Sequence, residues 1–340
     1  MKPGERVPIT QARDMLVPGE PLPFRIVDPL GRLLLAAGQR IADLGQLQAL
    51  LDRGASVESE ELARIRRERD ERAGLAKVPS HRRTTWFDAW ERQIWTLDRL
   101  LRALARGAVQ GEELQDFVDG QLRLVEHQPD AALYMAVRQD EHRFALYALT
   151  HALNVAAVAV LTARLLGWPE PRVRSLASAA VTMNASIVEL QAHMAEQSDP
   201  PSKRQLDEIR AHPGLSAQLL RAAGVDDPEW LAAVETHHER ADGSGYPQGL
   251  KEVGETAHLL RAVDVFTAKI SPRAFRAALR AQVAARHLFQ EESGGPMAAA
   301  LVKAVGVYPP GELVTLRSGD TGVVARRGQA SNTPEVVVVL

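Results

Sequence analysis

The spacing of hydrophobic residues predicts a long helical region between about residues 86 and 306. Apolar side chains recur there at intervals of three and four, which is the period of a helix that buries one face. Trp86, Trp90, Ile94 and Leu97 form one such stripe, which is more typical of a core or of helix pairing than of cofactor binding. The pattern predicts helices at 86–106, 111–126, 130–139, 141–166, 171–196, 203–223, 228–240, 255–270, 273–290 and 296–306.

The two ends of the chain carry a different pattern. In residues 1–57, two short apolar runs flank the turn sequence DPLG (28–31), and a helix is expected at about 43–52. Residues 307–340 contain short β-prone runs interrupted by Gly and Ser-Gly-Asp, which is typical of a small sheet. Acidic residues interleave with arginines in 58–85, which indicates a solvated helix or linker. We therefore expect four parts: an α+β module (1–57), a charged linker (58–85), a helical domain (86–306) and a β-rich tail (307–340).

Composition narrows the class of protein. The formal net charge is −2, which gives no electrostatic reason to expect binding to nucleic acid or to an anionic membrane. The chain has no cysteine, which excludes disulfides and thiolate chemistry. The longest apolar run, 156–161, is far below the roughly 18 residues of a membrane span. We expect a cytoplasmic protein without a membrane span.

Three histidines fall near helix boundaries. His237 and His238 end the helix that Asp227 caps, and both follow the buried side marked by Val234 at helical spacing. His212 precedes a proline, so the sequence predicts a kink or break in the helix there.

Two further polar residues interrupt very apolar helices. His151 lies in ALTHALNVAAVAV and Asp264 in HLLRAVDVFTAKI, so each needs a hydrogen-bonding or metal partner once it is buried. Four imidazoles and one carboxylate suit Fe, Mn, Zn or Ni. A core of hydrogen-bonded histidines without a ligand is the alternative.

The stretch HHERADGSGYPQGL (237–250) resembles the signature of HD-GYP domains, the cyclic di-GMP phosphodiesterase branch of the HD superfamily. The resemblance continues in order through HALNVA, AHPGLSAQLL, AVDVFTAK and SPRAFR and covers about residues 140–306. It implies an HD-GYP-type helical bundle, here with a small N-terminal α+β module and a short C-terminal β extension. It also implies two or three metals, usually iron or manganese. The implied metal ligands are His151, His212, His237, His238 and Asp264.

The resemblance also implies a ligand-binding groove beside the metals. The GYP loop would line this groove and a basic motif would contact phosphate; the residues concerned are Gly245, Tyr246, Pro247, Arg273 and Arg276. The Pro-Tyr centre of the family's basic motif reads Ala274-Phe275 here.

The name-giving His-Asp pair is missing. In LASAAVTMNASIVELQ, the histidine position reads Met183, the aspartate position Asn184 and the following lysine position Ile187. In the family that aspartate bridges two metals. A neutral amide cannot offset the repulsion between two divalent ions, and a thioether suits Mn(II) or Fe(II) poorly. Glu189 and His193 lie five and nine residues beyond Asn184, which is poor spacing for replacing the lost ligands.

The sequence therefore predicts a degenerate HD-GYP protein of cyclic di-GMP signalling that senses a ligand or docks a protein without hydrolysis. Cyclic di-GMP and diguanylate cyclase-type or other signalling proteins are the partners that the resemblance implies. At most one divalent metal (Fe, Mn, Zn or Ni) is expected, and a metal-free protein stays open. The alternative is an active, metal-dependent cyclic di-GMP phosphodiesterase with a mononuclear or rebuilt site.

Overall fold

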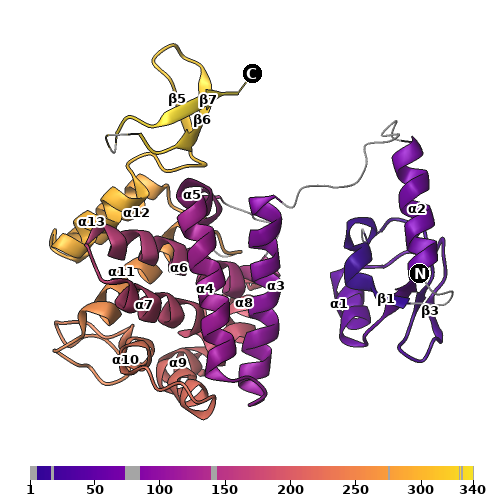
Figure 1. Ribbon diagram of the computed structural model, residues 1–340, viewed down its shortest axis with the longest axis horizontal. Coiled ribbons are helices and arrows are strands. Elements are labelled where there is room, and N and C mark those ends of the chain that lie inside the picture. The colour runs from indigo at the N-terminus through magenta and orange to yellow at the C-terminus, as the bar shows by residue number, and fades with distance from the viewer. Residues whose placement is uncertain are drawn as a thin grey trace. The chain divides into compact units, whose positions relative to one another are not determined.

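The computed structural model describes residues 6–16, 19–72, 85–138, 144–274, 276–328, 330 and 332–339. The chain divides into two compact units, Met1–Arg83 and Thr84–Leu340 (Figure 1). Most of the described residues are helical, with one small sheet in each unit, so the predicted fold class is confirmed.

The N-terminal unit is a small antiparallel sheet with two helices. The sheet has the order β1-β4-β2-β3, and its core contains Phe24, Ile26, Ile41 and Val57. Asp43 caps α1 by accepting a hydrogen bond from the backbone N–H of Gln46. The elements are β1 (Arg6–Pro8), a 3₁₀ turn (Ile9–Met15), β2 (Ile26–Val27), β3 (Leu33–Leu35), α1 (Leu44–Asp52), β4 (Ser56–Glu58) and α2 (Ser59–Arg72).

Part of the predicted linker is a helix of this unit. Helix α2 begins directly after β4, and its residues Leu62 and Ile65 pack into the N-terminal core. These two apolar side chains are spaced by three, so one face of an otherwise charged helix is buried. The module therefore continues beyond residue 57, while residues 73–84 of the predicted linker lie outside the described residues.

The second unit is a helical bundle built around α6. Nearly every residue of α6 is buried, because α4, α5, α7, α11 and α13 all pack against it. Among the described residues it is the one helix long and apolar enough to suit a membrane span, and its burial is that of a core helix. The helices are α3 (Trp86–Ala105), α4 (Gly111–His127), α5 (Pro129–Val137), α6 (Tyr147–Leu165), α7 (Glu170–Thr182), α8 (Val188–Glu196), α9 (Lys203–Ala222), α10 (Pro228–Thr236), α11 (Glu255–Ile270), α12 (Ala281–Glu291) and α13 (Pro296–Val305).

The chain of the second unit ends in a three-stranded antiparallel sheet. Strands β5 (Leu313–Thr315), β6 (Thr321–Arg326) and β7 (Glu335–Val338) follow one another in the order β5-β6-β7 (Figure 1). Arg327 ties this sheet to the helices, because it donates to Asp130 at 2.5 Å and to the Ala304 carbonyl at 2.7 Å.

Two predicted helices differ from the observed ones. The predicted helix 171–196 is interrupted after Thr182 by a short 3₁₀ turn (Ala185–Ile187), and α8 begins at Val188. Ser186 supports this turn by bonding to α9, a tertiary interaction that competes with a continuous helix. The predicted helix 273–290 begins only at Ala281, because the backbones of Arg273 and Arg276 exchange two 2.9 Å hydrogen bonds with each other.

Candidate metal centre

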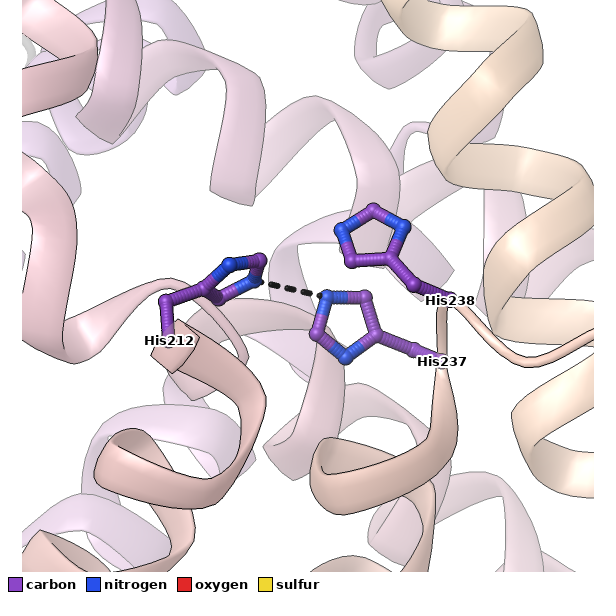
Figure 2. Close-up of side chains that lie close together, drawn as sticks. All are labelled: His212, His237 and His238. Atoms are coloured by element: carbon purple, nitrogen blue, oxygen red, sulfur yellow. Dashed lines mark hydrogen bonds between the residues drawn. The ribbon is translucent and has the colours of Figure 1, made fainter. Parts of the chain in front are cut away.

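Three histidines from two neighbouring elements converge in the helical bundle. His212 lies on α9, His237 caps the C-terminus of α10, and His238 follows it. One ligand atom from each lies within 4.8 Å of the others (Figure 2). The structure thus brings together three of the five metal ligands implied by the resemblance.

Helix α9 continues through His212, so of the predicted kink or break, the break is wrong. The helix runs through Pro213 from Lys203 to Ala222. Proline has no N–H, so it cannot bond to the carbonyl four residues earlier, on Ile209. The Nδ1 atom of His212 lies 2.5 Å from that same carbonyl oxygen and takes the place of the missing donor. Because Pro213 leaves the Ile209 carbonyl without its helical donor, that oxygen accepts from His212 and orients the imidazole ring.

The same kind of contact orients His237. Its Nδ1 atom lies 2.7 Å from the carbonyl oxygen of Val234. A carbonyl oxygen only accepts hydrogen bonds, so in both His212 and His237 the proton sits on Nδ1 and the Nε2 atom carries a lone pair. These two Nε2 atoms are 3.1 Å apart, joined by the dashed line in Figure 2.

Two facing lone pairs require a cation near both, either a proton or a metal ion. Burial, together with the neighbouring His237, lowers the pKa of His212 to about 3. Burial also lowers the pKa of His237. Both rings are therefore neutral near pH 7, and a divalent metal fits the two lone pairs better than a proton does.

His238 completes the cluster as a third neutral imidazole. Burial lowers its pKa well below the usual value, and repulsion between protonated His238 and His237 acts in the same direction. Its ring stacks on the Tyr246 ring, with centroids 4.5 Å apart and planes at 24°. Tyr246 belongs to the GYP loop, in which Gly245 is half-buried and Pro247 is exposed. Three imidazoles and open positions are a donor set that a catalytic or regulatory metal accepts.

His151 and Asp264 form a separate buried pair. His151 Nε2 lies 2.7 Å from Asp264 Oδ1, and Tyr147 stacks on the His151 ring at 5.4 Å. Burial would raise the pKa of Asp264, but the hydrogen bond with His151 and the charge of that ring hold it below its usual range. His151 Nδ1 has no hydrogen-bond partner among the described residues. The two side chains bond each other, with the proton on Nε2 shared toward the carboxylate, while Nδ1 stays without a described partner.

The basic motif lies beside this pair. Arg273 donates to the Tyr147 hydroxyl at 2.6 Å and lies 4.8 Å from the ring centroid, while Arg276 donates to the Ala268 carbonyl. Burial lowers the pKa of Arg276, and Arg273 adds to this effect. A cavity of about 70 Å³ adjoins Tyr147 and His151 and is lined also by Asn154, Trp90 and Arg138. Phe275 lies outside the described residues.

The positions that the resemblance assigns to the His-Asp pair lie in the turn between α7 and α8. Met183 is fully buried in the main core, and Asn184 and Ile187 are nearly so. Ser186, in the same turn, donates to the His212 carbonyl oxygen at 3.2 Å, which puts the turn against α9. The turn therefore offers the cluster no charged group.

The two residues weighed as replacements do not point to the cluster. The Glu189 side chain is 86% exposed and pairs with Arg102 at 3.4 Å. His193 is exposed on α8, outside the histidine group whose ligand atoms converge. Sequence reasoning missed Glu239 instead, which directly follows His238 and is buried. Its place in the HHE triplet was the only available signal.

Comparisons with known proteins agree with this fold. The family model for the HD domain matches residues 123–294. The chain is 28% identical over 236 residues to "Cyclic di-GMP phosphodiesterase PA4108" of Pseudomonas aeruginosa, covering 68% of this chain and 56% of that protein. It is 30% identical over 143 residues to "Cyclic di-GMP phosphodiesterase response regulator RpfG" of Xanthomonas campestris pv. campestris, covering 41% of this chain and 37% of that protein. The chain thus spans about half or less of the length of these relatives.

A solved structure has a similar fold. It is described as "Bd1817, a HDG"Y"P protein from Bdellovibrio bacteriovorus" and is 17% identical, with a TM-score of 0.54 over 87% of this chain and 97% of that one.

Proposed function

This chain belongs to the HD domain family, and from that premise we propose that it serves cyclic di-GMP signalling as a ligand-sensing or protein-docking module that does not hydrolyse the nucleotide. The names of its curated relatives support the nucleotide, since all are cyclic di-GMP phosphodiesterases. The lack of hydrolysis is argued from this chain's own residues.

The observation that carries the proposal is the neutral turn beside His212. Where two metals are to be bridged, the protein must supply anionic ligands, because two divalent ions roughly 4 Å apart repel strongly. Met183, Asn184 and Ile187 supply a thioether, an amide and a hydrocarbon, and all three are buried. The turn therefore supports neither a second ion nor the charge that develops on a reacting phosphate.

His212 and His237 would hold one divalent metal through their Nε2 lone pairs, and His238 would add a third ring nitrogen. A bound ion would supply positive charge and open coordination positions for an anionic ligand. His151 and Asp264, which the resemblance assigns to a second metal, are satisfied by each other. One ion without a bridging carboxylate supports binding of a phosphodiester better than its cleavage.

Arg273 and Arg276 would add positive charge to the binding groove. Arg273 is oriented by Tyr147, and its buried Nε atom has no partner among the described residues. The GYP loop would line the groove with Tyr246, and the same loop would offer a docking surface to a diguanylate cyclase-type protein. The N-terminal unit would provide a second interaction surface.

Hydrolysis by the purified chain tests the proposal. Cyclic di-GMP turnover would be followed with Mn(II) and, under anaerobic conditions, with Fe(II), beside the Met183→His/Asn184→Asp double variant. We expect no turnover by the native chain, nucleotide binding in the micromolar range or weaker, and a gain of turnover in the double variant. Metal-dependent turnover by the native chain would contradict the proposal.

The second candidate is a phosphodiesterase with a single metal or a rebuilt site. The three converging histidines favour it, because three protein ligands with open positions are the pattern of catalytic metal sites. Turnover by the native chain that disappears in His237→Ala would favour this candidate.

A further inference from the structure

Glu239 is a buried carboxylate directly beside the histidine cluster, and its side chain is only 1% exposed. Its two oxygens accept hydrogen bonds from the backbone N–H groups of Gln248, at 2.7 Å, and Leu250, at 2.9 Å. Charge-assisted bonds from two backbone donors offset the cost of burying a carboxylate. Glu239 directly follows His238, so these two bonds hold the far end of the GYP loop beside the histidine cluster.

The near end of the loop is fixed by close contact. A Cβ atom at Gly245 would lie 2.4 Å from the Arg240 nitrogen and 2.5 Å from the Glu239 Cα, so the backbone approaches more closely than any other residue allows. The next residue, Tyr246, donates its N–H to the His238 carbonyl at 3.2 Å. Tyr246 is therefore held between this contact and the two bonds to Glu239.

Tyr246 stacks on His238. Among the described contacts, His238 is the ring of the cluster that no backbone carbonyl orients. His212 and His237 are oriented through Nδ1, whereas the His238 ring contacts His212, His237 and Tyr246. The Tyr246 stack thus does for His238 what a hydrogen bond does for the other two.

We propose that Glu239 is a positioning residue: it holds Tyr246 on His238 and so keeps that imidazole ready to bind metal. The inference rests on the proposed metal centre, which it deepens. Glu239 does not ligate the metal itself, because both of its oxygens are engaged by the loop.

A double-mutant cycle tests the path through Tyr246. Glu239→Gln keeps the size of the side chain but places an NH₂ group opposite one backbone N–H. We expect it to weaken Mn(II) binding, measured by titration calorimetry, roughly tenfold, as is usual for residues that orient a ligand. Tyr246→Ala should cause a similar loss, Tyr246→Phe little, and Glu239→Gln/Tyr246→Ala no more than Tyr246→Ala alone. Additive losses would overturn the inference, as would unchanged affinity in Glu239→Gln with only a lower melting temperature.

A second measurement needs no metal. In protein labelled at histidine, the ring protons of His238, assigned by comparison with His238→Gln, should show the upfield NMR shift caused by a stacked tyrosine. Glu239→Gln should move this resonance toward its position in Tyr246→Ala, and an unmoved resonance would overturn the inference. If the native chain bound no Mn(II), the proposed metal centre would fail, and this shift alone would decide the role of Glu239.

Discussion

Two buried pairs in the helical unit use similar side chains and are chemically different. The Nε2 atoms of His212 and His237 face each other at 3.1 Å, and both present lone pairs. His151 Nε2 faces a carboxylate oxygen of Asp264 at 2.7 Å, with one proton between them. The first contact is incomplete without a cation, whereas the second is already bridged by a proton.

The difference originates at the other nitrogen of each ring. Backbone carbonyls of Ile209 and Val234 hold the protons of His212 and His237 on Nδ1, which leaves Nε2 free to bind a metal. His151 Nδ1 has no such partner among the described residues, so its proton is free to sit on Nε2 and bond Asp264. The contact of a ring's other nitrogen thus decides whether Nε2 presents a lone pair or donates a proton.

Breaking the self-satisfied pair should have the largest effect on stability. His151→Leu leaves the Asp264 carboxylate buried without its partner, which typically costs about 3–5 kcal/mol. We expect the free energy of unfolding, measured by urea titration, to fall by this amount. Metal binding by the three histidines should stay unchanged.

The matched control removes both partners. His151→Leu/Asp264→Leu should recover much of the loss, because two apolar side chains leave no unpaired charge. A stability of His151→Leu equal to that of the native chain would mean that the pair is not buried as described.

Removing one side chain from the histidine cluster should weaken metal binding and have less effect on stability. His237→Ala should weaken Mn(II) binding on the order of a hundredfold, about 3 kcal/mol, since each ligand supplies a share of a binding energy of roughly 10 kcal/mol or more. Equilibrium dialysis would measure this loss. Equal losses of metal from His237→Ala and from His151→Leu would contradict the division into two pairs.

The metal-free protein should lose stability as the pH falls below about 6.5. The pKa of His212 is lowered to about 3 in the folded state, so the unfolded chain binds the proton first. The stabilisation is present above pH 6.5 and is lost as pH falls toward 3, with about 2 kcal/mol lost between pH 6.5 and 5. Urea unfolding in a chelating buffer would measure it.

The control for this pH dependence is His212→Asn, which should flatten the curve in that range. Added Mn(II) should move the loss to lower pH, because the metal and the proton compete for Nε2. A curve that His212→Asn leaves unchanged would assign the effect to other groups.

Periodicity predicted most of the helices because burial of one face dictates the spacing along α3, α4 and α9. It failed where tertiary contacts decide. The break after Thr182 depends on Ser186 bonding to α9, and the late start of α12 depends on the bonds between Arg273 and Arg276. Neither contact has a signature in local sequence.

The sequence and the resemblance predicted the residues of the candidate site, but not the protonation of each histidine ring. The resemblance pointed to His151 and Asp264 as ligands in the same way as His212 and His237. Which nitrogen carries the proton depends on backbone carbonyls that no motif encodes. The sequence also did not predict the contact beside Pro213. The Ile209 carbonyl, which lacks its usual helical donor, accepts a hydrogen bond from His212, and the helix continues.

Metal content per chain tests the central claim most directly. Native protein would be loaded with Mn(II), or anaerobically with Fe(II), and freed of excess ion. Its metal content would then be measured by inductively coupled plasma mass spectrometry. We predict one ion per chain, bound by His212, His237 and His238, and two ions in Met183→His/Asn184→Asp. Two ions in the native chain would contradict the account, because a second site would then exist without the His-Asp pair.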